Sequence, residues 1–434
     1  MRIVHLTPGT GTFHCGSCLR DNVLIKALRA RQHDAMMVPL YLPLVTDGTA
    51  ANPEQGVQVG GISLFITQKM PWFAHMPGFV HRFLNKPQRL RMAAKRMGMT
   101  SPKMLGEMTV GSLLGEKGRQ WGEWKKLIDW LKTEPKTDVV SLSNSLLSGL
   151  AKPLSQLGVK VVCSLQGEDS FLDTLPEPWL TQAWEAMRDN AQYVTRFIAP
   201  SQYYAELMQK RLGVGPEKMA VVPNGMDVTP FPAAEPDPNF PTIGFFARMI
   251  HGKGLTLLVD AFIELMKRGT LPRLKLKIGG AVTAVDEKYV EVLKKKLKAA
   301  NCLQRVEFLP NLTFDQKVRF FRDLTVFSVP ATYGEAFGLY VLEAVASGIP
   351  VVQPRHGAFP ELIAATKGGV LCKPDDVTSL ADTLEELLLD DQKREQCSIQ
   401  GMAHVREDFT AARMAERFER VLHEAVSPGN PATK

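Results

Sequence analysis

The chain has 434 residues, of which 45% are hydrophobic and 22% charged, and a formal net charge of +7. This length exceeds what one hydrophobic core usually fills and favours two domains of about 200 residues each. No stretch reaches the roughly 18 uninterrupted apolar residues of a membrane span, and the first residues, MRIVHLTPG, lack the apolar region of a signal peptide. We therefore expect a globular, cytoplasmic protein whose positive charge favours anionic partners such as nucleotides, acidic lipids or nucleic acids.

A glycine-rich loop, TPGTGTFHCGSCLRDN at residues 7–22, follows the first apolar run at residues 2–6. Its Cys15 and Cys18 form a C-x-x-C step, which beside an alternating strand and helix pattern is compatible with a redox or metal site. The alternative is a loop whose backbone surrounds a phosphate. The six cysteines contain no other close pair, which excludes a disulfide framework and a four-ligand zinc set, so we expect reduced thiols.

Short β-branched runs recur along the chain at intervals that leave room for helices. The first half contains RIVHLTP, AMMVPLY, DVVSLSN, VKVVCSLQ, RFIAPS and AVVPNG, and the second half TIGFFAR, LKLKIGG, VEFLPN, LTVFSVP, IPVVQP and GGVLCKP. Continuous apolar strands that alternate with helices predict a parallel sheet covered on both faces. The fold class is therefore α/β, with two doubly wound Rossmann-like domains and with ligands at the carboxyl ends of the strands and in a cleft between the domains.

The four prolines of FPAAEPDPNFP, residues 231–241, predict a linker between these domains. We accordingly expect an N-terminal domain over residues 1–235, a C-terminal domain over 236–405, and a final helix and tail over 406–434. The final helix carries one apolar face at helical spacing, formed by Met414, Phe418, Val421, Leu422 and Ala425. This face must pack on a core, and the N-terminal domain offers one.

A basic and aromatic insertion is expected in the N-terminal domain at about residues 46–125. Within it, residues 66–104 hold eight Lys or Arg and no acid, interleaved with the aromatic residues Trp72, Phe73, Phe79 and Phe83. One hypothesis is peripheral docking on an anionic membrane, where each basic residue contributes about 1 kcal/mol. The alternative is a solvated face that holds an anionic soluble acceptor. No recognised nucleic-acid-binding fold accompanies the charge, so we expect no nucleic-acid partner.

Two cations lie on one predicted strand-to-helix turn, GFFARMIHGKGL at residues 244–255. Arg248 stands at the end of the strand, and Lys253 stands in the glycine-flanked loop that opens the next helix. Such a pair suits a diphosphate, because Arg offers a planar fork of donors and Lys a point charge. The alternative is a charged surface loop.

The stretch LTVFSVPATYGEAFGLYVLEAVASGIPVV, residues 324–352, places two carboxylates about the start of a predicted helix. Glu335 lies in the loop, the helix begins at about Gly338, and Glu343 lies one turn inside it. Carboxylates suit sugar hydroxyls, because an ionised carboxylate accepts several hydrogen bonds. The first N–H groups of the helix would bind a phosphate or sugar hydroxyls, and they belong to Phe337, Gly338 and Leu339. The alternative is that Glu335 caps the helix and Glu343 is a surface residue.

Together these motifs resemble those of the retaining glycosyltransferases of family 4, which have the GT-B fold. The resemblance rests on the acid pair in GEAFGLYVLEAVASGIPVV, on the Arg and Lys of the strand-to-helix turn, on PNGMDV at residues 223–228, and on RARQHDAMMV after the first helix. It spans nearly the whole chain in order. It implies a nucleotide-sugar donor held mainly by the C-terminal domain, an acceptor held mainly by the N-terminal domain, and transfer in the cleft without a metal or other cofactor.

The resemblance also implies roles for the site residues. Glu343 is expected to bind the ribose of the donor and Glu335 to approach the transferred sugar, while Arg248 and Lys253 neutralise the diphosphate. The leaving diphosphate gains negative charge as the sugar becomes oxocarbenium-like, so positioned cations lower the barrier. Attack on the face that the diphosphate leaves would retain the anomeric configuration, with a phosphate oxygen taking the proton.

Two positions depart from the family pattern. Cys15 and Gly16 match its paired glycines, which approach the diphosphate from the N-terminal domain, and only Gly16 keeps the lack of a Cβ. Where the family usually has a His at the end of an N-domain strand, VVCSLQGEDSF offers Gln166, which cannot become cationic. Glu168 is expected to contact the sugar or the acceptor in its place, and Asp169 is expected to be a solvated loop residue.

Two other functions stay open from the sequence. One is another nucleotide-sugar enzyme of this architecture, such as an epimerase or a phosphorylase. The other is a nucleotide-sugar-binding protein without catalysis, which Gln166 motivates. No residue is diagnostic for the donor base, the transferred sugar or the acceptor.

Overall fold

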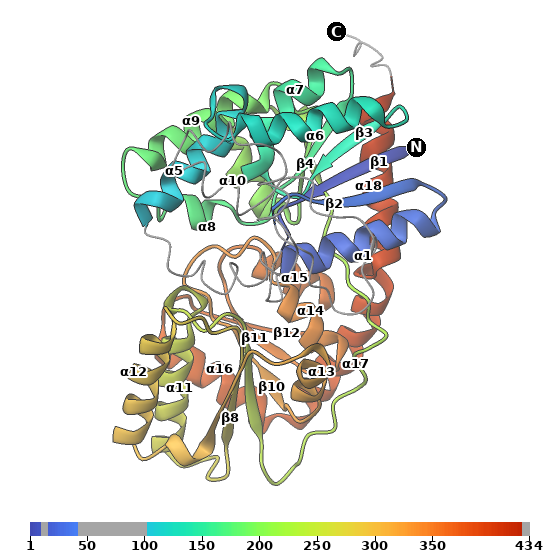
Figure 1. Ribbon diagram of the computed structural model, residues 1–434. Helices are drawn as coiled ribbons and strands as arrows, with labels where there is room; N and C mark the ends of the chain where they lie inside the picture. Colours follow the sequence, from blue (N-terminus) through green and yellow to red (C-terminus); the bar gives the residue numbers. More distant parts are fainter. Residues whose placement is uncertain (10–15, 42–101, 428–434) are drawn as a thin grey trace. The chain divides into compact units, whose positions relative to one another are not determined.

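The computed structural model describes residues 1–9, 16–41 and 102–427. The chain forms two compact units: unit 1 contains Met1–Gly225 together with Ala411–Lys434, and unit 2 contains Met226–Thr410. The described residues of each unit include a six-stranded sheet flanked by helices (Figure 1). The expected α/β class with two doubly wound sheets is confirmed.

The sheet of unit 1 is wholly parallel, with the strand order β2-β1-β3-β4-β5-β6. Its strands correspond to the six apolar runs of the first half of the chain. They are β1 (Arg2–Thr7), β2 (Asp34–Pro39), β3 (Val139–Leu142), β4 (Lys160–Ser164), β5 (Arg196–Ala199) and β6 (Met219–Val221). Every residue of β3 is buried, as expected for a central strand of a parallel sheet with both faces covered.

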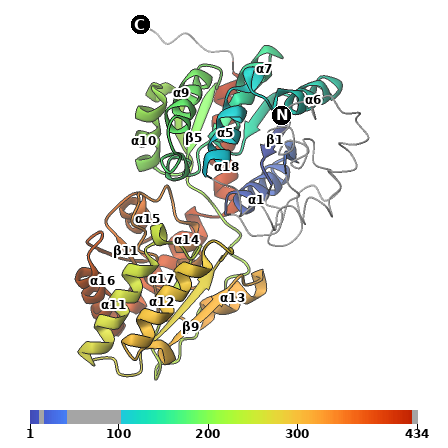
Figure 2. The ribbon, with the colours of Figure 1, turned by 60° about the vertical axis from the view of Figure 1, so that its left-hand side comes forward.

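Eight α-helices occur among the described residues of unit 1. They are α1 (Gly16–Ala30), α5 (Pro102–Leu113), α6 (Trp121–Thr133), α7 (Ala151–Gln156), α8 (Asp169–Leu172), α9 (Trp179–Ala191), α10 (Gln202–Leu212) and α18 (Ala411–Val426). The last of these, α18, lies beside α1 (Figures 1 and 2). Its predicted apolar face is buried and shares a core with Ile25 of α1 and Val162 of β4.

The sheet of unit 2 is also parallel, with the order β12-β11-β10-β7-β8-β9. Its strands correspond to the apolar runs of the second half of the chain. They are β7 (Thr242–Phe246), β8 (Lys275–Gly280), β9 (Val306–Pro310), β10 (Val326–Phe327), β11 (Val351–Pro354) and β12 (Gly369–Cys372). Because β7 pairs with both β8 and β10, the chain winds outward from β7 in both directions. In open α/β sheets, ligands bind beside such a switch point.

The described helices of unit 2 are α11 (Leu255–Arg268), α12 (Glu287–Ala299), α13 (Phe314–Arg322), α14 (Leu339–Ala346), α15 (Phe359–Thr366), α16 (Val377–Leu389) and α17 (Asp391–Asp408). Helices α11 and α12 lie side by side (Figure 2), and α16 packs against α11. Apolar residues of α11 at helical spacing are fully buried, among them Leu255, Leu258 and Phe262.

The boundaries between the units differ from those predicted. The chain enters unit 2 between Gly225 and Met226, rather than after residue 235, and returns to unit 1 at Ala411, rather than after residue 405. The first boundary predicted from the proline-rich segment lies too late in the chain. A high proline content indicates extended chain and does not by itself indicate a connection between domains.

The proline-rich segment 231–241 lies within unit 2. Phe231 is 3% exposed and belongs to the hydrophobic core of that unit. Ala234 N donates to Ser347 O at 2.7 Å, which ties the extended segment to the end of α14. The segment is therefore an extended, mostly exposed part of unit 2 and does not connect the two units.

Most of the predicted insertion falls outside the described residues, including the four aromatic residues on which the membrane-docking hypothesis depends. Residues 102–125, which the prediction also assigned to the insertion, form α5 and the beginning of α6. Leu113 and Trp124 of these helices are buried, so this part belongs to the body of unit 1. Among the helices that the structure describes, none is long and apolar enough to cross a membrane.

Candidate functional site

The switch point of unit 2 brings together two of the predicted site loops. Arg248 and Lys253 follow β7, and Glu335 follows the neighbouring strand β10. Thr332 N donates to Gly252 O at 3.0 Å, which joins the two loops through their backbones. The sequence could not show this adjacency, because the strands are about 80 residues apart and pair only after the sheet forms.

The loop after β7 packs closely on the loop after β10. Gly254 has φ +74°, and a Cβ placed there would lie 1.7 Å from Pro330 O. Glycine is required at this position both by its left-handed conformation and by the close approach of the second backbone. This contact sets the place of Lys253, which directly precedes Gly254.

Lys253 and Glu335 form an ion pair within this contact. Lys253 Nζ donates to Glu335 Oε2 at 2.5 Å, and Tyr340 OH donates to the same oxygen at 2.7 Å. The Lys253 ammonium also lies 5.0 Å from the ring centroid of Tyr333 and 5.4 Å from that of Tyr340. Both charged side chains are mostly buried. The site therefore holds a positive and a negative charge in contact, with little water between them.

The surroundings keep Lys253 charged and Tyr340 neutral. Burial lowers the pKa of Lys253, but the Glu335 carboxylate and the Tyr333 side chain raise it by more, so the pKa lies above its usual value. Burial and then the Glu335 carboxylate raise the pKa of Tyr340 well above its usual value. Tyr340 is therefore a hydrogen-bond donor to Glu335 at neutral pH.

The backbone of Glu335 is supported by the chain after β11. Ala358 N donates to Glu335 O at 2.9 Å. Gly357 has φ +60°, and a Cβ at that position would lie 2.6 Å from Glu335 N. The carboxylate is thus carried by a loop that is braced on two sides, by the turn after β7 and by the turn after β11.

Arg248 is held by a carboxylate that the sequence analysis did not identify. Its Nε and one terminal nitrogen donate to Asp286 at 3.1 and 3.2 Å. Asp286 is 5% exposed and also accepts from the backbone N and the hydroxyl of Thr283, at 2.9 and 2.7 Å. Burial raises the pKa of Asp286, but the hydrogen bonds from Arg248 and Thr283 lower it by more. The Arg248 side chain is half exposed, so this fork leaves part of the guanidinium open to solvent.

Helix α14 begins where the sequence predicted. Gly338 precedes its first residue, with φ +91°. The first N–H groups of any helix lack intrahelical acceptors, and in α14 they are those of Gly338, Leu339 and Tyr340, because the first intrahelical bond runs from Val341 N to Gly338 O at 2.9 Å. The prediction named Phe337, Gly338 and Leu339, and of these Phe337 precedes the helix. Phe337 is buried, so these residues offer backbone groups, and not the Phe337 side chain, to the surroundings.

Glu343, one turn inside α14, pairs with a cation from another helix. Lys317 Nζ of α13 donates to Glu343 Oε1 at 2.9 Å, and both side chains are mostly buried. The alternative interpretation of Glu343 as an ordinary surface residue is therefore wrong. Lys317, like Asp286, was missed because neither residue lies in a motif and both reach the site through the tertiary fold.

In unit 1, Gln166 lies just after β4 and points toward the chain after β3. Its Nε2 donates to Ser143 O at 3.2 Å. Glu168 is buried and joins the two loops, because its Oε1 accepts from Ser145 N and its Oε2 from Gln166 N, each at 2.8 Å. The Tyr204 hydroxyl lies 3.0 Å from Glu168 Oε2. The Glu168 carboxylate is thus engaged inside the fold.

Asp169, expected to be a solvated loop residue, shares this tyrosine. The Tyr204 hydroxyl lies 2.9 Å from Asp169 Oδ1 as well as close to Glu168. Burial raises the pKa of Asp169, although the hydrogen bond from Tyr204 lowers it in part. Asp169 is therefore part of a polar contact between α8 and α10.

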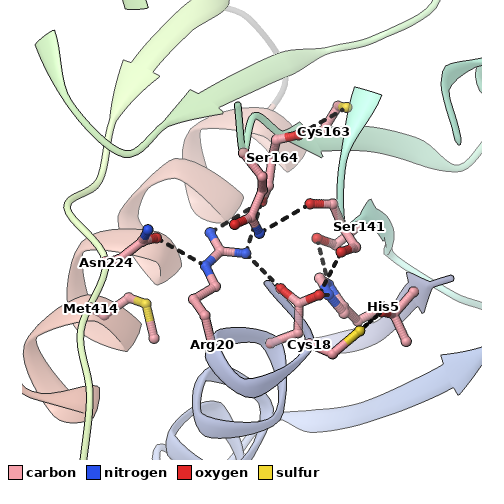
Figure 3. Close-up of polar contacts among 12 residues, drawn as sticks. His5, Cys18, Arg20, Ser141, Cys163, Ser164, Asn224 and Met414 are labelled. Carbon is pink, nitrogen blue, oxygen red and sulfur yellow. Dashed lines mark hydrogen bonds and ion pairs between the residues drawn. The ribbon is translucent and has the colours of Figure 1, made fainter. Parts of the chain in front are cut away.

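A buried polar network holds α1 on the sheet of unit 1. Arg20 donates from Nε to Asn224 Oδ1 at 3.2 Å and from both terminal nitrogens to Ser164 Oγ at 3.3 Å, as Figure 3 shows. Asp21 accepts from Arg20 at 2.8 Å and faces His5 Nε2 at 3.3 Å. Buried charges require such partners. The network places the first turn of α1, which begins at Gly16.

Of the two cysteines in the C-x-x-C step, only Cys18 is among the described residues. Cys15 lies outside the described residues. Cys18 is buried in α1, with Sγ 3.4 Å from Thr7 Oγ1. Within the part of the chain that the structure describes, no three His, Cys, Asp or Glu side chains are grouped as a metal site would require.

Two family models match adjoining parts of the chain. Residues 230–404 match the family described as glycosyl transferases group 1, and residues 107–229 match the glycosyltransferase family 4. The first match covers most of unit 2 and therefore contains Arg248, Lys253, Glu335 and Glu343. The second contains Gln166 and Glu168.

Curated relatives are similar over part of their length. A D-inositol 3-phosphate glycosyltransferase of Corynebacterium diphtheriae is 34% identical over 187 residues, which are 42% of this chain and 42% of that protein. A GDP-mannose-dependent monoacylated alpha-(1-6)-phosphatidylinositol monomannoside mannosyltransferase of Corynebacterium glutamicum is 27% identical over 64% of this chain and 73% of that protein. In three D-inositol 3-phosphate glycosyltransferases of Corynebacterium, the matched segment spans less than half of the relative's length.

Solved structures share the fold over nearly the whole chain. Anabaena HepE, crystallised with UDP and glucose, is 18% identical, with a TM-score of 0.67 over 97% of this chain and 99% of that chain. Sucrose-phosphate synthase from Thermosynechococcus elongatus is 15% identical, with a TM-score of 0.69 over 98% and 99% of the two chains. At these identities the likeness shows the fold alone, and it confirms the two-sheet architecture.

Proposed function

The chain belongs to the glycosyl transferases of group 1, of the family 4 type, and from this membership we propose that it moves a sugar from a nucleoside diphosphate sugar to an acceptor hydroxyl with retention of configuration. The observation that carries the proposal is the contact of Lys253 with Glu335 at the switch point of unit 2. A cation for the diphosphate and a carboxylate for the sugar stand there side by side. Both are needed where a sugar leaves a diphosphate.

The diphosphate would be bound by three kinds of donor. Arg248 offers the part of its guanidinium that Asp286 does not engage, and Lys253 offers its ammonium. The start of α14 offers the backbone N–H groups of Gly338 and Leu339, with that of Phe337 just before the helix, and a helix start favours an anion through both hydrogen bonding and the helix dipole. Glu343 would accept from the ribose hydroxyls.

The chemistry requires stabilised charge more than a strong base. As the bond between the sugar and the diphosphate breaks, negative charge grows on the leaving oxygen, and Arg248 and Lys253 would offset it. Glu335, held by Lys253 and Tyr340, would face the positive charge that develops on the sugar. Attack by the acceptor on the face that the diphosphate leaves gives retention, with the proton passing to a phosphate oxygen.

In unit 1, Gly16 would approach the diphosphate and Gln166 would approach the sugar. Gln166 offers an amide in place of an imidazole, so it donates and accepts hydrogen bonds without charge. We assign Glu168 a positioning role in which it acts on the sugar or the acceptor through Gln166. Its carboxylate accepts a hydrogen bond from the backbone N–H of Gln166. No metal or other cofactor takes part in this proposal.

The names of relatives guide the choice of substrates to test. Several relatives are named as D-inositol 3-phosphate glycosyltransferases, and others as mannosyltransferases. One of the mannosyltransferases is named as dependent on GDP-mannose. GDP-mannose and inositol phosphates are therefore sensible first members of a donor and acceptor panel. UDP-glucose joins the panel because it is bound in a structure of HepE, which shares the fold.

A second candidate function is a protein that binds nucleotide sugars without transferring them. The observation that favours it is Gln166, because an amide cannot carry the positive charge that an imidazole could bring to the reaction. Turnover separates the two functions, since both bind the donor.

The test begins with thermal unfolding of the purified chain against UDP, GDP, ADP and their sugars. A ligand at about a hundred times its dissociation constant stabilises the folded state by about 2.7 kcal/mol. The stabilising donors are then incubated with inositol phosphates and lipid acceptors in the presence of EDTA, and products are resolved by mass spectrometry and NMR. We expect transfer with retained configuration. Binding without transfer or hydrolysis supports the second candidate, and stabilisation by no nucleotide rejects both.

A further inference from the structure

Lys317 is a buried cation to which the proposed function gives no role. It lies on α13 with 8% of its surface exposed. Its Nζ lies 5.8 Å from the ring centroid of Phe231 and 5.3 Å from that of Phe314. A buried ammonium needs an opposite charge, which Glu343 supplies at 2.9 Å, while the two ring faces add a weaker attraction.

This ion pair makes the two oxygens of Glu343 unequal. Oε1 accepts from Lys317. Within the described residues, no hydrogen-bond donor is in contact with Oε2. The ion pair restricts rotation of the carboxylate, because Lys317 is itself enclosed by Phe231 and Phe314. One oxygen is thus engaged by the protein, and the other is free to accept from a ligand.

We propose that Lys317 is a positioning residue of the nucleotide site: it orients the Glu343 carboxylate so that Oε2 accepts from a ribose hydroxyl of the bound nucleoside diphosphate. The inference rests on the proposed function, in which Glu343 takes the ribose. Lys317 does not touch the nucleotide in this arrangement. Its effect should therefore depend on whether the ligand has ribose hydroxyls, whereas a merely structural lysine would affect all nucleotides alike.

The experiment compares ribose with its deoxygenated form. Binding of UDP, GDP and ADP to the full chain is measured by calorimetry, and the tightest is compared with its 2′,3′-dideoxy counterpart. A hydrogen bond to a charged acceptor predicts that the wild type prefers the ribose form by about tenfold or more. In Lys317→Met we expect this preference to fall to about twofold or less, as in Glu343→Gln. The double variant should lose no more than either single variant, because the two side chains act together.

Lys277→Met is the matched control, since Lys277 is also a largely buried lysine of unit 2 paired with a carboxylate, that of Asp323 at 2.7 Å. It should keep the ribose preference. Circular dichroism and thermal unfolding verify that each variant is folded. If Lys317→Met does not fold, Lys317→Arg decides, because its broader planar fork should displace the carboxylate and reduce the preference by at least threefold.

Two failures are distinguishable. If the wild type prefers the ribose form and the folded Lys317 variant keeps that preference in full, the inference is overturned and the proposed function stands. If the folded wild type binds none of the three nucleoside diphosphates, the proposed function fails, and the inference fails with it.

Discussion

Lys253 and Glu335 come from loops that follow neighbouring strands, and their charged atoms lie 2.5 Å apart. The pair spans the switch point of unit 2, where the loops are also joined by a backbone hydrogen bond. An incoming diphosphate would be attracted by the one charge and repelled by the other. The two residues should therefore affect donor binding in opposite senses, although in the proposed function both take part in transfer.

Lys253→Met should weaken binding of the nucleoside diphosphate by about tenfold or more, because it removes a positioned cation. Glu335→Gln should leave this binding unchanged or tighten it, because it removes the repelling charge while keeping a similar shape. Both should lower the rate of transfer on the order of a hundredfold. Calorimetry and initial rates measure the two effects separately. Near-normal transfer by both folded variants would remove this pair from the mechanism.

Asp286 should make the stability of the chain depend on acid pH. Its folded-state pKa lies below the ordinary 3.8, since the hydrogen bonds from Arg248 and Thr283 outweigh the effect of burial. A carboxyl whose pKa is lower in the folded state adds stability above its unfolded-state pKa, and this stability is lost as the pH falls through the folded-state pKa. Urea unfolding between about pH 2.5 and 6 should show this loss in the wild type, and a smaller one in Asp286→Asn.

Thr283→Val is the companion variant for this measurement. It removes the hydroxyl that donates to Asp286 while leaving the backbone N–H in place. We expect an acid dependence between those of the wild type and Asp286→Asn. Identical pH profiles for all three proteins would mean that the lowered pKa of Asp286 does not contribute to the free energy of unfolding.

Tyr204→Phe tests how the loops of unit 1 are held together. The substitution removes only the hydroxyl that contacts Glu168 and Asp169, so we expect a loss of about 1–2 kcal/mol in the free energy of unfolding. Glu168→Gln should cost more, because this carboxylate also accepts two backbone N–H groups. Tyr193→Phe, at a partly buried tyrosine outside this cluster, should be nearly neutral. Equal losses at both tyrosines would contradict the arrangement.

Gly357→Ala should damage the Glu335 loop more than an ordinary glycine substitution would. Gly357 and Gly269 both have positive φ, at +60° and +74°. A Cβ at Gly269 meets nothing within 4 Å, whereas one at Gly357 would meet Glu335 N at 2.6 Å. Gly269→Ala should therefore show only the backbone strain of about 1 kcal/mol, and Gly357→Ala should exceed it and also lower transfer. Similar stability and activity in the two variants would show that the loop yields without cost.

The sequence predicted the local parts of this structure well. All twelve apolar runs are strands, and α14 begins one residue after Gly338. Such features depend on neighbours in the chain, namely a continuous apolar run or a glycine at a helix start. The same kind of information pointed to Arg248, Lys253, Glu335 and Glu343, because each lies in a segment between a strand and a helix or in the first turns of a helix.

The partners of these residues could not be predicted. Asp286 and Lys317 are ordinary charged residues of helical segments in the sequence, and their burial arises only when distant strands pair. For Glu168 the sequence suggested a contact with the sugar or the acceptor, which stays a prediction, but it did not show that the carboxylate bonds to backbone N–H groups of two loops. The sequence pattern of a helix or strand predicts which of its residues are buried. It does not predict which side chains of another helix or strand will contact them.

The place of α18 has a consequence for the order in which the units fold during synthesis. Unit 2 is inserted into unit 1, and the backbones at its two ends meet where Met226 N donates to Phe409 O at 2.9 Å. Unit 2 contains no part of α18 and can thus close before it, whereas the core beneath α1 stays open until Met414 and Phe418 arrive. A released chain truncated after residue 410 should therefore be protease-resistant in unit 2 and protease-sensitive in unit 1.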